Sequence, residues 1–298
     1  MTTAKDSAAL FGGAAQEPLF ECHGHIISDG ADTKKSFARH TPIPDDAQLR
    51  ATLAVLREAG VVFYRDGGDR YGVSCRAKTL APEYGIDYRT PGFLLYKKGR
   101  YGGLYGEDFS DAREFTQRVR YLARSVADFI KIAVSGIVDF ATGGMSCPAL
   151  EYDEIAEMIK IAHGEGFAVM CHASGREAVT NAVLAGADSI EHGIFADDEA
   201  IYAMRENGCV WVPTVTALTA LAGRPEFSFP ALPQIIAEHI EAVKRAAALG
   251  VLLASGSDAG SLGVFQGRGA AREAALLRNA GIFFDDGNKA ISERFTPQ

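Results

Sequence analysis

The segment Phe20-Glu21-Cys22-His23-Gly24-His25-Ile26 is a short, largely apolar run that carries two histidines one residue apart. In an extended strand the side chains alternate between two faces, so both imidazoles point to the same side. Such a pair suits zinc, iron, nickel or copper. Because His-x-His also occurs by chance, the segment predicts a metal site only where other strands supply further ligands.

The pattern of this segment, a short apolar strand followed by a loop and a helix, recurs along the chain. We expect eight strands, at residues 19–26, 61–64, 92–96, 129–134, 167–172, 188–192, 209–213 and 251–258. We expect helices at residues 45–59, 110–127, 152–164, 177–185, 197–207, 234–250, 270–280 and 288–294. Strands that alternate with helices predict a parallel α/β fold, and eight repeats over about 250 residues favour a closed (β/α)8 TIM barrel over an open sheet. No Gly-x-Gly-x-x-Gly follows the first strand, which argues against a dinucleotide-binding fold.

Length and composition indicate one globular domain. The 298 residues are 47% hydrophobic and 23% charged, the ordinary profile of a chain with a proper core. We expect residues 1–17, which are small and polar, to form a lead-in, and residues 18–298 to form the barrel. The net charge of −8 offers no basic face for nucleic acid.

The chain also lacks the sequence features of membrane and secreted proteins. No run reaches the roughly 18 apolar residues of a membrane span, and the opening residues lack the apolar core of a signal peptide. Five cysteines at scattered spacing, with no Cys-x-x-Cys, predict neither a disulfide framework nor a Cys-rich zinc module. We therefore expect a cytoplasmic protein that acts on a small molecule, without nucleic-acid or membrane partners.

Polar side chains gather at the carboxyl ends of the expected strands, where TIM barrels build their active sites. Six candidates occupy these positions: His23, His25, Lys131, His172, His192 and Asp258. Taken singly, His172 and His192 would be satisfied core histidines, but their occurrence at consecutive strand ends favours metal ligands. The three other histidines fall in expected loops or helices and are predicted to lie on the surface: His40, His163 and His239.

Lys131 stands out because its neighbours in Phe129-Ile130-Lys131-Ile132-Ala133-Val134 are all apolar. Burial lowers the pKa of a lysine and makes the neutral amine accessible. A neutral amine can add carbon dioxide to become a carbamate, an anionic ligand with two oxygens that can bridge two metals. The alternative is an internal ion pair between Lys131 and Asp258 or Glu191.

Asp258 lies in the small-residue segment Ala254-Ser255-Gly256-Ser257-Asp258-Ala259-Gly260, which lets a metal or a substrate approach the backbone closely. A carboxylate there can bind a metal and accept the proton of a metal-bound water, so Asp258 is also the catalytic candidate. The alternative is a simple cap at the end of the barrel.

The order His23-Gly24-His25, Lys131, His172, His192 and Asp258 resembles the amidohydrolase superfamily, in the subgroup whose binuclear centre is bridged by a carboxylated lysine. The stretches 169–193 and 256–260 are similar to its imidazolonepropionase-like, prolidase-like branch. The resemblance covers roughly residues 18–295. It departs at Gln266-Gly267, where relatives often have His-Gly, and in the absence of the accessory β-sandwich, which would expose barrel surface and suggests a homo-oligomer.

The resemblance implies two divalent metal ions, with zinc first and manganese, iron or cobalt also compatible. One metal would be held by His23, His25, Lys131 and Asp258, and the other by Lys131, His172 and His192, with a carbon dioxide-derived carbamate on Lys131. A hydroxide that bridges the metals would attack a carbonyl or similar electrophile, and Asp258 would take and pass on the proton.

Loops determine the substrate in this architecture. The candidate substrate contacts are Arg65, Tyr101, Arg176, Arg224 and Gln266. Arginines can clamp a carboxylate through paired hydrogen bonds, and the alternative, favoured for each arginine taken singly, is a solvated surface residue. The first hypothesis is hydrolysis of the amide C–N bond of a small carboxylate-bearing substrate, such as a dipeptide or N-acyl amino acid. The alternatives are a lactone or phosphotriester hydrolase, a deaminase or cyclic-amide hydrolase, and a catalytically inactive binding barrel.

Overall fold

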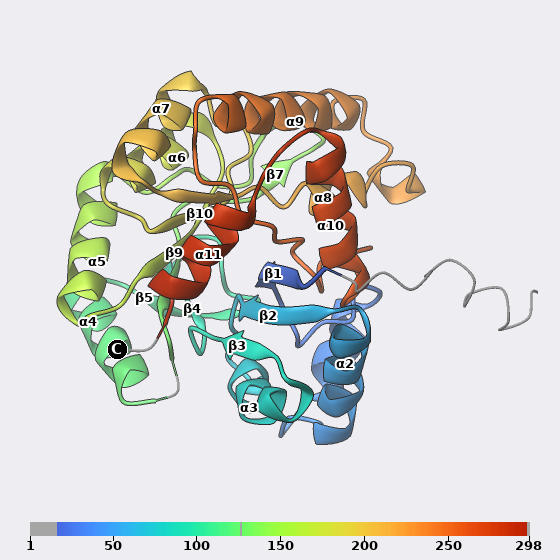
Figure 1. Ribbon diagram of the computed structural model, residues 1–298. Coiled ribbons are helices and arrows are strands. Elements are labelled where there is room, and N and C mark those ends of the chain that lie inside the picture. Colours follow the sequence, from blue (N-terminus) through green and yellow to red (C-terminus); the bar gives the residue numbers. More distant parts are fainter. Residues whose placement is uncertain (1–16, 126, 297–298) are drawn as a thin grey trace, which may run out of the picture.

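The computed structural model describes residues 17–125 and 127–296 and shows parallel strands surrounded by helices (Figure 1). The parallel strands are β1 (Leu19–Gly24), β2 (Val61–Asp66), β3 (Asp87–Arg89), β4 (Leu94–Lys97), β5 (Gly106–Phe109), β6 (Ile130–Ala133), β9 (Val169–Ala173), β10 (Ser189–His192) and β11 (Val210–Val212). A short antiparallel hairpin pairs β7 (Val138–Asp139) with β8 (Gly144–Met145). Most of the lead-in predicted for residues 1–17 lies outside the described residues.

The strands pair in the order β1-β2-β3 and β11-β10-β9-β6-β4-β5. The third barrel strand is interrupted, because β3 pairs with β2 whereas β4 pairs with β6. Pro91-Gly92 separates the two halves, and proline has no amide hydrogen to donate to a ladder. The predicted strand at residues 92–96 is therefore the second half of a longer, broken strand.

The eighth strand closes the ring through isolated contacts. Leu253 forms a single parallel bridge with Trp211 of β11. On the side of β1, the Cys22 amide donates to the Ser255 carbonyl at a distance of 2.9 Å, and the Asp258 amide donates to the His23 carbonyl at a distance of 2.8 Å. A Cβ at Gly256 would lie 2.7 Å from the His23 amide nitrogen, so this close approach requires glycine. The predicted (β/α)8 barrel is confirmed.

Eleven α-helices of the described residues surround the strands. They are α1 (Thr33–Arg39), α2 (Asp46–Glu58), α3 (Val73–Leu80), α4 (Ala112–Ala123), α5 (Tyr152–Gly164), α6 (Arg176–Leu184), α7 (Asp198–Asn207), α8 (Val215–Thr219), α9 (Leu232–Ala248), α10 (Arg268–Asn279) and α11 (Asp285–Arg294). Three helices absent from the predicted set, α1, α3 and α8, are only seven, eight and five residues long. Helix α11 crosses the front of the barrel in Figure 1 and contacts β1 and β11.

Two histidines predicted to lie on the surface are buried. His239 of α9 is 2% exposed, packs edge-on against Trp211 and places Nε2 2.8 Å from the Pro213 carbonyl. His40 is 3% exposed, and its Nδ1 accepts a hydrogen bond from the Asp45 amide. The His239 ring therefore packs between α9 and the strand of Trp211, and the His40 ring joins the end of α1 to the start of α2. The side chain of His163 is at the surface as predicted, beside Asp188.

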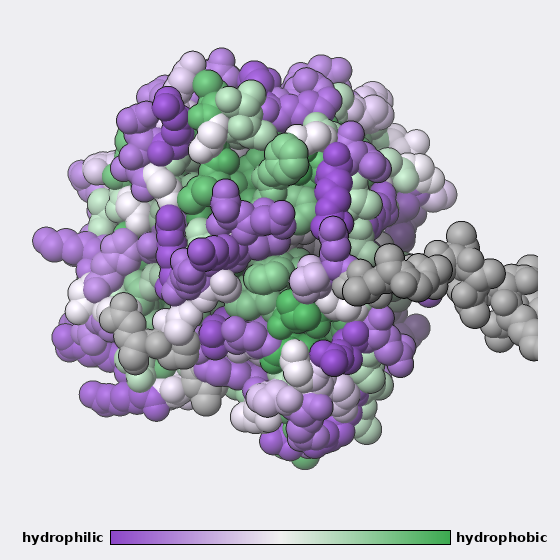
Figure 2. Space-filling view, in the orientation of Figure 1, coloured by the Kyte–Doolittle hydropathy of each residue, from purple (hydrophilic) through white to green (hydrophobic). Residues whose placement is uncertain are grey.

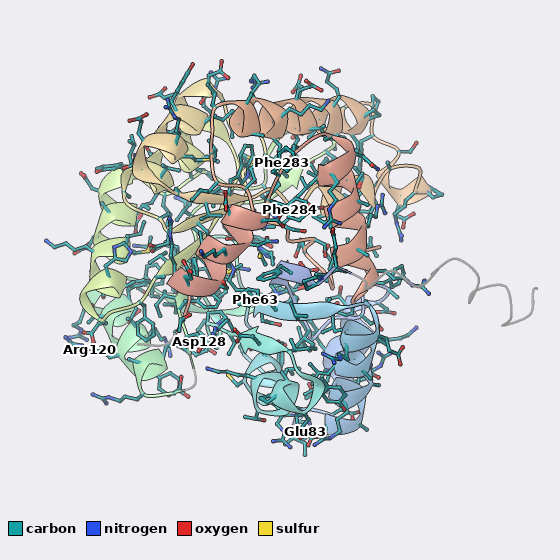
Figure 3. The ribbon with its side chains drawn as sticks, in the orientation of Figure 1. Phe63, Glu83, Arg120, Asp128, Phe283 and Phe284 are labelled. Atoms are coloured by element: carbon teal, nitrogen blue, oxygen red, sulfur yellow. The ribbon has the colours of Figure 1, made fainter. Side chains whose placement is uncertain are left out.

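The face in Figure 2 is mostly hydrophilic, with apolar residues gathered near its middle. Phe283, in the connection between α10 and α11, is 90% exposed (Figure 3). Within the described ranges, no helix is both long enough and apolar enough to span a membrane.

Candidate metal centre

Three of the predicted ligands form a compact group at the carboxyl end of the barrel. The Nε2 atoms of His23 and His25 each lie 3.7 Å from Asp258 Oδ1. One ligand atom from each of the three residues fits within a span of 4.8 Å. Since imidazole nitrogens and a carboxylate oxygen are standard ligands of divalent transition metals, this group suits one such ion.

The other three predicted ligands adjoin this group. Lys131 Nζ lies 3.3 Å from His23 Nε2. The ring of His192 is centred 4.9 Å from that of His23 and 4.7 Å from that of His172. The structure thus brings all six predicted residues together from β1 and the residue that follows it, from β6, β9 and β10, and from the segment after Leu253.

Lys131 is buried without an acidic partner in ion-pair contact. Among the described residues, no carboxylate lies within 4.0 Å of its Nζ, so the alternative ion pair with Asp258 or Glu191 does not form. Burial lowers the pKa of Lys131 to about 8, although Glu191 and Asp258 oppose that shift. The same burial raises the pKa of Asp258 to about 7.

Hydrogen bonds hold three of the histidines in one orientation. His23 Nδ1 lies 2.5 Å from Glu191 Oε2, and His192 Nδ1 lies 2.8 Å from Thr214 Oγ1. His172 uses the other nitrogen, with Nε2 3.1 Å from the Gly136 carbonyl. Each ring therefore keeps one nitrogen for a metal, and such outer partners fix the tautomer of a metal-binding histidine.

Electrostatics keep these rings available as ligands. Burial holds the pKa of His23, His25 and His192 well below the usual value, and it lowers that of His172 to about 4. A neutral imidazole has the free lone pair that a metal requires, whereas the imidazolium does not. The donor set therefore fits divalent metal ions.

The backbone of the site is strained at three positions. Four non-glycine residues in the described ranges have a positive φ, and three of them line the site: His192 at 66°, Thr214 at 48° and Asp258 at 60°. The left-handed region costs of order 1–3 kcal/mol for a non-glycine residue and persists where surrounding contacts enforce it. At Gly67, by contrast, any Cβ would collide with the His25 ring and lie 2.6 Å from Lys131 Nζ.

Beneath the ligands lies a buried ion network that the sequence did not reveal. Arg65 is fully buried and donates from Nε to the Cys22 carbonyl (2.7 Å), from Nη1 to Ser189 Oγ (2.9 Å) and from Nη2 to Glu191 Oε1 (2.7 Å). The second oxygen of Glu191 holds His23. Arg65, predicted as a substrate contact, is thus a buried structural residue, because all its nitrogens are engaged. Glu191 is the positioning residue that the sequence prediction missed.

A cleft with two lobes opens above the ligands. Both lobes share Tyr101, Ile137, His172, His192, Asp258, Ser261 and Leu262. What we name the apolar lobe, of about 190 Å³, is further lined by six apolar residues, Val138, Phe140, Ile194, Ala217, Leu218 and Leu221, and by Ser174 and Thr214. The polar lobe, of about 280 Å³, is further lined by His25, Thr33, Leu94, Leu104, Tyr105 and Lys131. Tyr101, a predicted substrate contact, borders both lobes, with its ring centred 4.9 Å from that of His172.

The other predicted substrate contacts lie outside this cleft. The exposed Arg176 side chain pairs with Asp197, and Arg224 pairs with Glu226. Gln266 is buried. Its Nε2 donates to the carbonyls of His25 and Ser28, and its Oε1 accepts from the Tyr64 hydroxyl, with a donor–acceptor distance of 3.0 Å in each bond. Its amide supports the loop of His25 and has no group left for a substrate. The predicted arginine clamp is therefore not assembled.

A TIM barrel with this ligand set at its carboxyl end has the features of metal-dependent hydrolases. The model of the Amidohydrolase family matches residues 80–289, and the chain belongs to that family.

Two curated proteins and one solved structure illustrate what the chain is similar to. Ochratoxinase of Aspergillus niger is 26% identical over 276 residues, covering 80% of this chain and 57% of that protein. An uncharacterized protein of Mycobacterium tuberculosis is 30% identical over 190 residues, covering 62% of this chain and 50% of that protein. The chain thus spans about half the length of these curated relatives. The structure of an Xaa-Pro dipeptidase with bound methionine superposes with a TM-score of 0.71 at 24% identity, covering 93% of this chain and 73% of the other.

Proposed function

We propose that this chain is a metal-dependent hydrolase that cleaves an amide bond, in which water adds to the carbonyl carbon and the C–N bond breaks to give a carboxylic acid and an amine. The observation that carries the proposal is the group formed by His23, His25 and Asp258, with both Nε2 atoms 3.7 Å from one carboxylate oxygen. The family match and the similarity to ochratoxinase and an Xaa-Pro dipeptidase support the same reaction class.

We extend the proposal to two metals. His23, His25 and Asp258 would hold one, His172 and His192 the other, and Lys131 would bridge them as a carbamate, formed when the neutral amine adds carbon dioxide and releases one proton. The absence of a described acid within ion-pair distance of Lys131 Nζ and the lowered pKa of this lysine support that reaction. Bound there, the metals supply Lewis acidity and an acidified water ligand.

The residues of the chain would then direct the proton. Asp258 Oδ1 lies 3.7 Å from each of the two histidine Nε2 atoms, and Asp258 lines the cleft, where it can accept the proton of the attacking water and return it to the departing amine. Glu191 keeps the His23 ring oriented, and Thr214 does so for His192. Tyr101 and Leu262 border the space where the substrate would lie.

Metal analysis and one substrate panel test this function. Protein supplied with zinc and bicarbonate is expected to hold two metal ions per chain, and Lys131→Ala is expected to retain at most one. The panel comprises dipeptides, N-acyl amino acids, neutral amides, lactones, phosphotriesters and cyclic amides, and we expect turnover of amides. Fewer than one metal per chain, or turnover of lactones or phosphotriesters alone, would contradict the proposal.

We also propose that the chain forms a homo-oligomer. Support comes from Phe283, which is 90% exposed between α10 and α11 (Figure 3). Contiguous exposed apolar patches mark contact surfaces, and apolar residues gather near the middle of the face on which Phe283 lies (Figures 2 and 3). Light scattering is expected to give a multiple of the 31.8 kDa chain mass, and a monomeric mass at micromolar concentration would overturn this point.

A further inference from the structure

The apolar lobe is formed by two loops that face each other across the ligands. Ile137, Val138 and Phe140 come from the segment of the β7–β8 hairpin, and Ala217, Leu218 and Leu221 come from α8 and the residues after it. Phe140 also meets Phe227 edge-on, at 6.2 Å between ring centres, which joins the two loops. Apolar side chains on both sides make this lobe suited to an apolar group.

Charged groups are almost absent from the cleft. In the described structure, Asp258 is the one acidic side chain that lines the lobes, and Lys131 is the one basic side chain apart from the histidines. Arg176 and Arg224 are held elsewhere by Asp197 and Glu226. Beside Val138, Phe140, Leu218 and Leu221, a carboxylate would lose its hydration and would find no cationic side chain as a partner among the described lining residues, which is costly.

We propose that the substrate places a neutral apolar group, a phenyl ring or an alkyl chain of similar size, in the apolar lobe beside His192 and Asp258. This inference rests on the proposed amide hydrolysis and names the substrate class. Size agrees with it, because the lobe holds about 190 Å³ and a cavity of about 150 Å³ lined by Leu, Ile and Phe binds benzene. The carboxylate-bearing substrates predicted from the sequence should therefore be poor ones when their carboxylate enters this lobe.

Two matched series of amides test the proposal with the metal-loaded protein. The acyl series compares acetamide, butanamide, hexanamide and phenylacetamide with succinamate. The amine series compares N-propylacetamide and N-benzylacetamide with N-acetylglycine. In at least one series we expect kcat/KM to rise about fourfold per added methylene, since each buried methylene is worth about 0.8 kcal/mol. The carboxylate-bearing member of that series should fall at least 100-fold below its neutral partner.

A variant at the entrance sharpens the test. Ile137 lines both lobes and is 47% exposed, so Ile137→Arg introduces a cation while the fold tolerates the change. We expect it to reduce the preference for neutral over carboxylate-bearing amides at least tenfold. Ile43→Arg is the matched control, because Ile43 is 73% exposed and does not line either lobe. The control should keep the preference of the unaltered protein.

Binding of ketones that cannot be hydrolysed separates the two proposals. Calorimetry is expected to detect 4-phenyl-2-butanone but not levulinate, and Ile137→Arg should weaken the former. This binding pattern without turnover of any amide would overturn amide hydrolysis and support the apolar lobe. Turnover of amides with equal or greater kcat/KM for carboxylate-bearing members in both series would overturn the apolar lobe and leave amide hydrolysis standing.

Discussion

The ligand group and the ion network beneath it are both buried and polar, yet their hydrogen bonding differs. In the network, each of the three guanidinium nitrogens of Arg65 donates a hydrogen bond, to Cys22, Ser189 or Glu191. In the ligand group, His172 and His192 are each held through one nitrogen, and the other nitrogen has no hydrogen-bond partner among the described residues, whereas His23 Nε2 lies 3.3 Å from Lys131 Nζ. Because buried polar groups without a ligand role are normally satisfied, we assign the unused nitrogens to the layer that we propose to bind metal and the saturated ones to the supporting layer.

Among substitutions that test this difference, we expect the largest effect from Asp258→Asn, which should lower turnover. Replacement by Asn keeps the shape and tolerates the left-handed backbone but removes the proton acceptor. We expect kcat to fall about 10²–10⁴-fold, the range that general acid–base catalysis supplies. Urea unfolding should show an unchanged or higher stability, because a buried carboxylate is removed. Retention of more than a tenth of kcat would show that Asp258 does not carry the proton.

Substitutions in the supporting layer should instead lower the free energy of unfolding. Arg65→Leu leaves Glu191 buried without its cation, and losing one partner of a buried pair costs about 3–5 kcal/mol. Denaturant unfolding measures this loss. Arg39→Leu is the control, because its pair with Asp29 is partly exposed and should contribute about 0–1 kcal/mol. Equal losses in the two variants would remove the distinction between the layers.

The buried carboxyl group of Glu273, outside both layers, is expected to make the stability of the fold depend on pH. From α10 its carboxyl group accepts from the amides of Val215 and Thr216, and burial raises its pKa to about 7 from an ordinary 4.5. A folded-state pKa above the unfolded one means that the folded state binds the proton more tightly. The associated stability, roughly 3 kcal/mol, is therefore present below pH 4.5 and is lost as pH rises through 7. Unfolding of Glu273→Gln across this window should show a flatter pH dependence, whereas an identical slope would refute the assignment.

The smallest expected effect is at Gln266. Gln266→Leu removes the bonds to the carbonyls of His25 and Ser28, which should cost about 1–3 kcal/mol of stability. KM should stay within about twofold of its original value, because the side chain does not reach the cleft. A tenfold rise in KM with unchanged stability would restore the substrate role that the sequence suggested.

Sequence patterns predicted the barrel and the six ligand candidates because both depend on local order: a short apolar run, then a polar residue at its end. Pairings between distant residues were not predictable in this way. Arg65 and Glu191 are 126 positions apart, and nothing near either one indicates their contact. The arginine clamp failed for a related reason, since Arg224 finds Glu226 two residues away. His239 was misplaced because a helix periodicity does not tell which polar residue turns inward.

The positive φ of Asp258 restricts which amino acids can hold the site's carboxylate. Asp and Asn occupy this backbone region far more readily than longer side chains, because they form short local hydrogen bonds there. Aspartate is therefore selected twice, by its chemistry and by the turn on which it sits. A homologue or a designed library that exchanges this position for glutamate would keep the charge and lose the conformation, so conventional similarity scores would rank this substitution as far milder than it is.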